Sequence, residues 1–235
     1  MVRLWNTPIV EFPLLASLPE SLQQRVVAAA RRRRFDRREV VVHEGDLADS
    51  LHLVRSGRLA AQVATPHGQL ATLTVIGPGE YFGEISLLNH RQPRRTATIV
   101  ALETTETLSI SRSTFNRLCE EHPDVLHLLT VALAGTVDRL TQRLLETMYD
   151  DLDHRVYRQL VVLAEVYADA PSSNSATIPF TQEVLAEFVG GARPSVNGVL
   201  QKLQSRGLVQ VHRGKVTVLD RAALTTRLRR EGEHR

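Results

Sequence analysis

A change of periodicity along the chain most strictly limits what it can fold into. Between Arg38 and Ser111 the apolar residues fall in short β-branched runs separated by turn residues, and on both sides of this stretch they recur at helical spacing. Short strands joined by glycine turns are typical of a sandwich or barrel. We therefore predict an α+β chain with a β-barrel between helical segments. The predicted strands are Val40–Val42, Ser50–Val54, Arg58–Val63, Leu70–Val75, Thr96–Val100 and Glu106–Ile110.

The longest helical pattern begins after Pro123 and reaches about Asp150. At about 1.5 Å per residue such a helix is roughly 40 Å long, more than one small barrel can cover. Its apolar residues recur by threes and fours, as in helices that pair. We predict that a second copy covers them in a twofold homodimer, with packing on the chain's own barrel as the alternative. The stripe comprises Leu126, Leu129, Leu133, Val137, Leu140, Leu144 and Met148.

The last part of the chain has the order of elements of a winged helix-turn-helix, a DNA-binding unit. Together with the barrel and the long helix, it predicts three domains, at residues 1–121, 122–150 and 151–235. The DNA-binding unit comprises a helix capped by Thr181 and ending at Val189, a turn at Gly190 and Gly191, a second helix from Arg193 to Ser205, and a hairpin of Leu208–Val211 and Lys215–Val218.

One stretch carries residues suited to a ligand. It reads GPGEYFGEISLLNHRQPRRTATIV from Gly77 to Val100 and places Glu84 and Arg95 on either side of a short polar loop. A carboxylate can accept from a sugar hydroxyl, and a guanidinium forms a forked pair with phosphate oxygens. Backbone N–H groups near Glu84, where a short helix should begin, can help to hold the anion. The alternative is a buried ion pair of Glu84 and Arg95 without a ligand.

This stretch resembles the phosphate-binding cassette of cyclic-nucleotide-binding domains, and the whole chain resembles the cyclic-AMP receptor protein family of bacterial transcription regulators. The resemblance implies a jelly-roll barrel (a double-stranded β-helix), a long dimerisation helix and a winged helix-turn-helix. It also implies that Glu84 holds the ribose 2′-hydroxyl, that Arg95 holds the cyclic phosphate, and that Thr96 adds a hydroxyl and an N–H. Arg94, one residue out of register, should point elsewhere. The implied nucleotide-binding residues are Gly83, Glu84, Ile85, Ser86, Arg95, Thr96, Leu140 and Thr141.

The resemblance favours cyclic AMP as the allosteric effector and leaves cyclic GMP open. Leu140 and Thr141 align with the family's two base-contacting positions, but Leu140 replaces a threonine that bonds the adenine amine. Thr141 could still bond the base in the other subunit's pocket. A threonine after the arginine, as at Thr96, is often associated with cyclic GMP elsewhere in the superfamily. Thr136 replaces an arginine that braces the ribose-binding glutamate.

The resemblance also implies that the second helix of the DNA-binding unit enters the major groove. Arg193 takes the place of the leading recognition arginine and can pair with guanine O6 and N7. Pro194 replaces a glutamate that reads cytosine, and Gly198 replaces a second arginine, so the operator should differ. Ser195 and Lys202 are expected at phosphates. The predicted DNA-binding residues are Thr181, Arg193, Pro194, Ser195, Asn197, Gln201, Lys202 and Arg213.

The expected partners are pseudo-palindromic double-stranded DNA, a cyclic nucleotide, a second copy of the chain and RNA polymerase. No apolar run approaches the roughly 20 residues of a membrane span, so we expect a cytoplasmic location and no membrane partner. The single cysteine, Cys119, excludes an internal disulfide and a four-cysteine iron–sulfur cluster. No nucleophile–base pair, metal-ligand spacing or Walker loop is present. We therefore expect no catalytic residue, no metal and no enzymatic activity.

Two charged segments have competing interpretations. Residues 150–154 read Asp-Asp-Leu-Asp-His, which could suggest a metal site. Successive helical residues point in different directions, however, so helix capping at a hinge is the better interpretation. Arg31–Arg34, with Arg37 and Arg38, form a basic block that we place between a helix and a strand as solvated surface, with DNA contact as the alternative. For the whole chain, a different effector or none at all is the remaining alternative.

Overall fold

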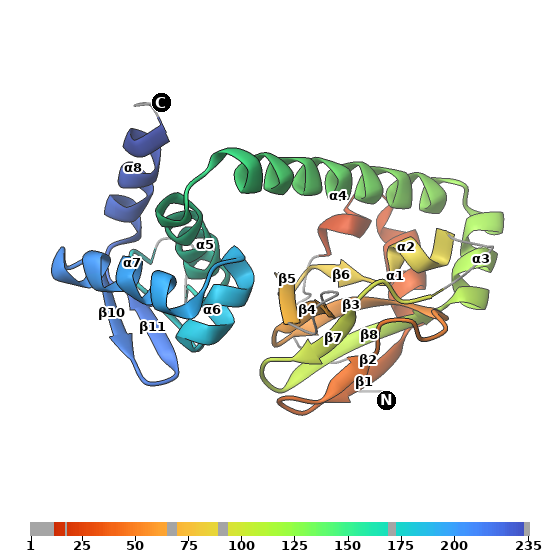
Figure 1. Ribbon diagram of the computed structural model, residues 1–235. Coiled ribbons are helices and arrows are strands. Elements are labelled where there is room, and N and C mark those ends of the chain that lie inside the picture. The colour runs from red at the N-terminus through yellow and green to blue at the C-terminus, as the bar shows by residue number, and fades with distance from the viewer. Residues whose placement is uncertain (1–11, 17, 65–69, 89–93, 169–172, 233–235) are drawn as a thin grey trace. The chain divides into compact units, whose positions relative to one another are not determined.

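The computed structural model describes residues 12–16, 18–64, 70–88, 94–168 and 173–232. The chain divides into two compact units, whose elements Figure 1 labels. The first unit comprises residues 1–63 and 76–137, and the second comprises residues 64–75 and 138–235. Among the described residues, no helix combines the length and the apolar composition needed to cross a membrane.

The six predicted strands and two further ones form two four-stranded sheets, and the neighbours β1–β8, β8–β3, β3–β6, β2–β7 and β7–β4 are antiparallel. Side chains alternate across each strand, so one face of a strand can enter the core while the other meets solvent. The first sheet has the order β1 (Arg31–Phe35), β8 (Thr105–Ser111), β3 (Ser50–Ser56) and β6 (Tyr81–Phe82). The second has the order β2 (Val40–Val42), β7 (Thr98–Ala101), β4 (Leu59–Ala64) and β5 (Leu70–Ile76).

One predicted turn requires glycine. Gly57 joins β3 to β4 with φ +77°, a conformation that side chains disfavour. A Cβ there would also lie 2.5 Å from the backbone oxygen of Thr104. The turn therefore depends on the missing side chain.

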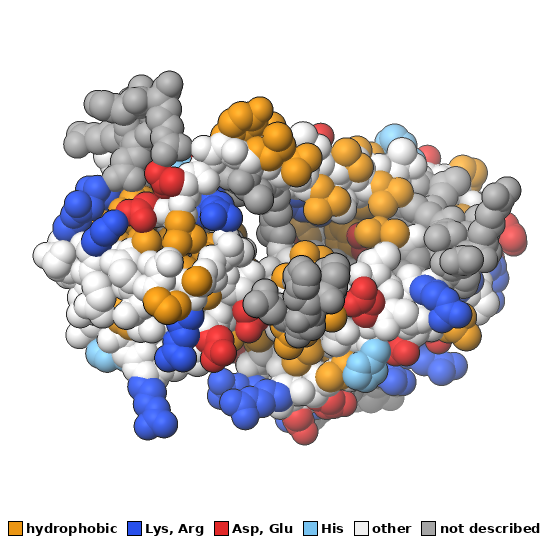
Figure 2. Space-filling view, viewed as in Figure 1, with side chains coloured by type: hydrophobic (Ala, Val, Ile, Leu, Met, Phe, Trp, Pro, Cys, Tyr) orange, Lys and Arg blue, Asp and Glu red, His pale blue; other side chains and the backbone are white. Residues whose placement is uncertain are grey.

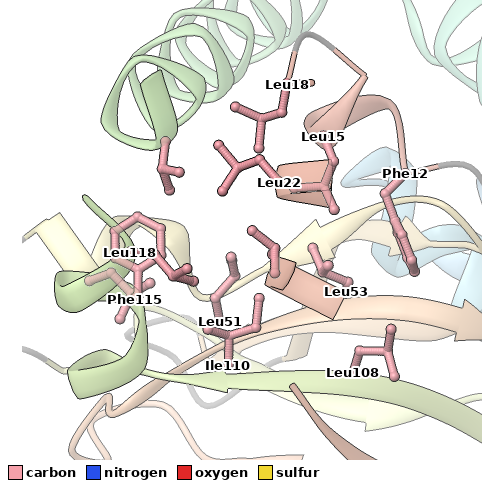
Figure 3. Close-up of a cluster of buried hydrophobic side chains, with 13 residues drawn as sticks. Phe12, Leu15, Leu18, Leu22, Leu51, Leu53, Leu108, Ile110, Phe115 and Leu118 are labelled. Atoms are coloured by element: carbon pink, nitrogen blue, oxygen red, sulfur yellow. The ribbon is translucent and has the colours of Figure 1, made fainter. Parts of the chain in front are cut away.

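Apolar side chains on one face of the first sheet pack against the flanking helices (Figure 3). In the register between β3 and β8, Leu51 lies opposite Ile110 and Leu53 opposite Leu108. These residues join one buried cluster with side chains from the N-terminal helices and the helices after β8. The helices are η1 (Pro13–Leu15), α1 (Glu20–Ala28), α3 (Arg112–Glu121) and α4 (Asp124–Tyr149).

Several elements correct the sequence prediction. Arg31–Arg34 do not link a helix to a strand, because they are themselves most of β1 and pair with β8 from Arg31–Ser109 to Phe35–Thr105. The strands β6 and β9 (Ala176–Ile178) and the last helix, α8 (Arg221–Gly232), were not predicted. The four arginines are exposed, as expected of a solvated surface. Pro93, which belongs to the predicted cassette, lies outside the described residues.

The second unit contains the predicted helix-turn-helix and hairpin. Thr181 caps the first helix, since its Oγ1 accepts from the Val184 N–H at 3.2 Å. Gly190 ends that helix in the left-handed region, with φ +62°. The elements are α5 (Leu152–Val166), α6 (Gln182–Val189), α7 (Arg193–Ser205), β10 (Val209–His212) and β11 (Lys215–Val218), with β9 beside β11.

The acidic segment before α5 caps that helix, as predicted. Asp151 Oδ1 accepts from the His154 N–H at 2.9 Å. Asp150 pairs with Arg158 at 3.0 Å, and Asp153 has a separate partner described below. The described part of the chain contains no group of three potential metal ligands.

Candidate functional site

The centre of the candidate site is the buried side chain of Arg95. Its backbone is fixed on both sides, because the Arg95 N–H donates to the Asp46 carbonyl and the Gly45 N–H donates to the Arg95 carbonyl, both at 2.9 Å. Nη2 of Arg95 donates to Oγ of Ser50 at 3.0 Å and lies 3.7 Å from Oδ1 of the exposed Asp49. One terminal nitrogen of the guanidinium is therefore already held.

The other two nitrogens of this guanidinium are not held. Nε and Nη1 of Arg95 are buried and have no hydrogen-bond partner among the described residues. Burial lowers the pKa of Arg95, and the carboxylates of Asp49, Glu84 and Asp46 oppose that effect. Buried donors are nearly always paired in native proteins, and an unpaired one is costly. A phosphate oxygen is a suitable acceptor for such a buried guanidinium donor.

Glu84 is also buried, at 8% exposure, and it begins the short helix α2 (Glu84–Leu88). The preceding residue, Gly83, has φ +94°. A Cβ on Gly83 would overlap Nη1 of Arg95 and would lie 2.6 Å from the Ser50 carbonyl oxygen. Gly83 thus contributes space for the guanidinium, whereas Glu84 contributes a buried acceptor.

The remaining predicted nucleotide-binding residues are more exposed. Ile85 and Thr96 are exposed, and the side chain of Ser86 lies outside the described residues. Arg94 is directed away as expected, because its Nη1 donates to the Gly45 carbonyl at 2.7 Å. Leu140 and Thr141 are both exposed on α4. Their predicted contact with a base remains a prediction.

Sequence reasoning missed two residues beside Arg95. Ser50 holds the guanidinium directly, and its Oγ lies 3.2 Å from Nε2 of His52. Both residues belong to β3, two positions apart, so they lie on the same face of the strand. That spacing was visible in the sequence, but nothing there indicated that this face turns toward Arg95.

Six of the eight predicted DNA-binding residues lie on α7. Arg193, Pro194 and Ser195 are exposed at its start, whereas Asn197 is half-buried. The opposite face is anchored in the core of the unit. The buried anchors are Val196, Val199, Leu200 and Leu203.

Three further predicted DNA-binding residues have distinct surroundings. Nζ of Lys202 donates to Oδ2 of Asp153 at 3.0 Å, and this hydrogen bond raises the pKa of Lys202. Sequence patterns could not predict this pair, since the residues are far apart in the chain. Arg213 is exposed in the turn between β10 and β11, and Gln201 is exposed on α7.

Comparison with known proteins identifies the family to which the chain belongs. Residues 32–122 match the cyclic nucleotide-binding domain, and residues 154–227 match the Crp-like helix-turn-helix domain. The cyclic AMP receptor protein of Thermus thermophilus is 30% identical over 212 residues, which cover 90% of this chain and 94% of that protein. The CRP-like cAMP-activated global transcriptional regulator of Mycobacterium tuberculosis is 28% identical over 196 residues, covering 83% and 87%.

Solved structures of similar proteins have the same fold. The Thermus thermophilus catabolite activator protein has a TM-score of 0.54 and 30% identity, covering 91% of this chain and 96% of its own. The c-di-GMP responsive regulator CLP of Xanthomonas campestris has a TM-score of 0.73 and 24% identity, covering 85% and 99%, and shows the shared fold.

Fold and site together define a DNA-binding transcription regulator with a cyclic-nucleotide-binding domain. The members of its family regulate transcription and are not enzymes, so this chain is not an enzyme either. The chain belongs to the cyclic-AMP receptor protein family, also called the Crp-Fnr family.

Proposed function

We propose that this chain is a homodimeric transcription regulator whose effector is cyclic AMP. The observation that carries the proposal is that two buried nitrogens of Arg95, Nε and Nη1, have no hydrogen-bond partner among the described residues. A cyclic phosphate carries one negative charge and two exocyclic oxygens, which can accept hydrogen bonds from a buried guanidinium. Glu84 then accepts from the ribose 2′-hydroxyl, and Thr96 supplies a further hydroxyl and N–H.

We assign the contacts to the nucleotide base to the apolar Leu140 and to Thr141. Thr141 would bond the base in the pocket of the other subunit. Cyclic GMP is the first alternative, because Thr96 follows the phosphate-binding arginine. Cyclic di-GMP is a third candidate, since a neighbour of this fold responds to it.

A second copy of the chain is proposed to cover α4. Hydrophobic side chains lie exposed along this helix (Figure 2). Large apolar side chains at more than half exposure on one helix are costly in water, and their spacing by threes and fours fits pairing with an identical helix. The exposed residues of the predicted stripe are Val137 at 60%, Leu140 at 57%, Leu144 at 60% and Met148 at 62%.

Two α7 helices in one dimer would read a pseudo-palindromic operator, with half-sites about one helical turn of DNA apart. Nucleotide must bind the DNA-competent arrangement more tightly than the other, since otherwise no population shifts. We place the sensor at residues 1–121, the dimer helix at 122–150 and the DNA-binding domain at 151–235. Bacterial RNA polymerase is the expected transcription partner, and the cytoplasm is the expected location.

Calorimetric titration of the full chain with cyclic AMP, cyclic GMP and cyclic di-GMP tests this proposal. Cyclic AMP should bind the wild type most tightly. Arg95→Ala should weaken that binding by roughly 100-fold, because charged hydrogen bonds are each worth about 1.5–3 kcal/mol. The matched control is Arg94→Ala, which removes the neighbouring arginine that points away and should stay within about threefold of wild type.

Two outcomes would change the conclusion. Binding by Arg95→Ala within about twofold of wild type would exclude this pocket. Tighter binding of either guanine nucleotide would keep the pocket and replace the effector.

A further inference from the structure

We propose that Ser50 and His52 form a hydrogen-bonded support that orients the guanidinium of Arg95 toward the phosphate. Ser50 is the direct support, and His52 is a positioning residue that acts through Ser50. The proposal rests on the proposed role of Arg95 as the phosphate-binding residue. It adds two residues of β3 to the determinants of nucleotide affinity.

The support is a continuous chain of polar contacts. Nη2 of Arg95 donates to Oγ of Ser50 at 3.0 Å, and Nε2 of His52 lies 3.2 Å from the same oxygen. On the other side of the ring, Nδ1 of His52 lies 3.0 Å from Oγ1 of Thr107 on β8. Ser50 engages Nη2, and within the described part of the chain Nε and Nη1 have no hydrogen-bond partner.

The available protons give each contact a direction. The Ser50 hydroxyl has one hydrogen, which it donates to Oδ1 of Asp49 at 2.9 Å. Its oxygen therefore accepts from Arg95 and has a second lone pair for His52. This network assigns the hydrogen of the imidazole to Nε2, which donates to Ser50, and makes Nδ1 the acceptor of the Thr107 hydroxyl.

The charge state of His52 agrees with that assignment. Burial, followed by the positive charges of Arg95 and Arg33, lowers the pKa of His52 to about 4, although Asp49 opposes the shift. The imidazole is therefore neutral near pH 7, with one donor and one acceptor nitrogen. A neutral ring supports Arg95 without repelling it.

Packing holds the ring in place. His52 is 5% exposed and stacks on Phe82, with 4.7 Å between ring centroids and 13° between planes. Phe35 adds a tilted contact at 6.5 Å. If the support were lost, the guanidinium could turn toward Asp49, whose Oδ1 is 3.7 Å from Nη2 and whose side chain is 87% exposed. That turn would change the direction of the guanidinium relative to the phosphate.

A double-mutant cycle in the full chain tests the support. Ser50→Ala and His52→Phe should each weaken cyclic AMP binding about tenfold, as expected for one misaligned charged hydrogen bond. His52→Phe keeps a ring against Phe82. The double variant should also be about tenfold weaker, because removal of Ser50 already disconnects His52. Ser50→Thr, which keeps the hydroxyl, should bind within about threefold of wild type.

A control variant distinguishes loss of the Ser50–His52 support from a general loss of stability. Thr105 is fully buried, and its hydroxyl donates to the backbone carbonyls of Arg58 and Glu103. Thr105→Val should lower the urea midpoint of unfolding and leave cyclic AMP affinity unchanged.

The remaining outcomes distinguish this inference from the proposed function. A loss of about 100-fold in the double variant would mean that His52 acts independently of Ser50, which overturns the support. Wild-type affinity in both single variants would also overturn it, while a large loss in Arg95→Ala would leave the proposed function standing. Normal binding by Arg95→Ala would overturn both.

Discussion

The deep position of Arg95 depends on a residue that lacks a side chain. Gly83 has a positive φ, and a Cβ there would overlap the guanidinium. Any substitution of Gly83 therefore has two unfavourable effects. One is backbone strain of about 1 kcal/mol or more, and the other is displacement of Arg95 itself.

We expect Gly83→Ala to destabilise the chain and to weaken cyclic AMP binding by at least about tenfold, as measured by urea unfolding and calorimetry. Gly207→Ala is the matched control, because Gly207 has φ +70° with open space where a Cβ would lie. It should lose a similar amount of stability with no change in nucleotide affinity. Unchanged affinity in Gly83→Ala would show that Arg95 can move without loss.

His52 also makes stability depend on pH. The pKa of His52 is about 4 in the folded protein and about 6.5 in the unfolded chain. As the pH falls, the unfolded chain is therefore protonated at a higher pH than the folded protein. The contribution of the neutral ring is complete above pH 6.5 and is lost progressively between pH 6.5 and pH 4, by up to about 3 kcal/mol. Urea unfolding at pH 7.5 and pH 4.5 should show a smaller pH-dependent loss for His52→Phe than for wild type. An equal loss in both would assign the effect to other groups.

Among the described elements, α4 carries the most exposed large apolar side chains. Leu144→Asp should split the proposed dimer, because a charge in a paired apolar seam costs several kcal/mol, roughly 3 or more. The control is Gln142→Asp, an exposed position about 200° away around the helix. Light scattering should report a monomer for the first variant and a dimer for the second. A dimer in both would place the interface elsewhere.

The recognition helix α7 is expected to make two kinds of DNA contact, one to a base through Arg193 and one to a phosphate through Lys202. Arg193→Ala should relax the preference at one base pair of each half-site, at a cost of about 1–3 kcal/mol. Lys202→Ala should weaken binding to all sequences and lower the salt slope by roughly one. Its effect should be the smaller of the two, because Lys202 already pairs with Asp153. Selection from random duplexes decides this, and an unchanged consensus for Arg193→Ala would contradict the assignment.

The sequence predicted elements where periodicity was regular and failed where pairing imposed the structure. The strands with alternating apolar residues were all found, with ends shifted by a few residues. The arginine run of β1 has no β-branched pattern and is extended because each residue pairs with β8. The last helix, α8, is mostly polar, so it has no apolar stripe to detect. For the candidate site, the sequence motif pointed to Glu84 and Arg95, which are both buried, whereas the contacts of Ser50 and His52 depend on the fold of the sheet.

For the whole molecule, effector and operator must act on each other equally. If cyclic AMP raises operator affinity by some factor, the operator raises cyclic AMP affinity by the same factor, expected at about 5- to 150-fold. Fluorescence anisotropy with labelled duplex, with and without nucleotide, measures the first factor, and calorimetry of the DNA complex measures the second. Arg95→Ala should bind DNA as unliganded wild type does, with and without cyclic AMP. Nucleotide-independent DNA binding by the wild type would remove the regulatory role.

The arginines of β1 have a consequence for how the protein behaves when it is crowded. β1 is the edge strand of its sheet, and an edge exposes backbone groups that can pair with another chain. Arg31–Arg34 are all exposed there, and although Arg32 pairs with Glu106, two such edges that approached each other would bring arginines of both chains together. This repulsion disfavours sheet-to-sheet aggregation during high expression, when barrels meet often. Copies of the chain are therefore expected to associate through surfaces other than the β1 edge.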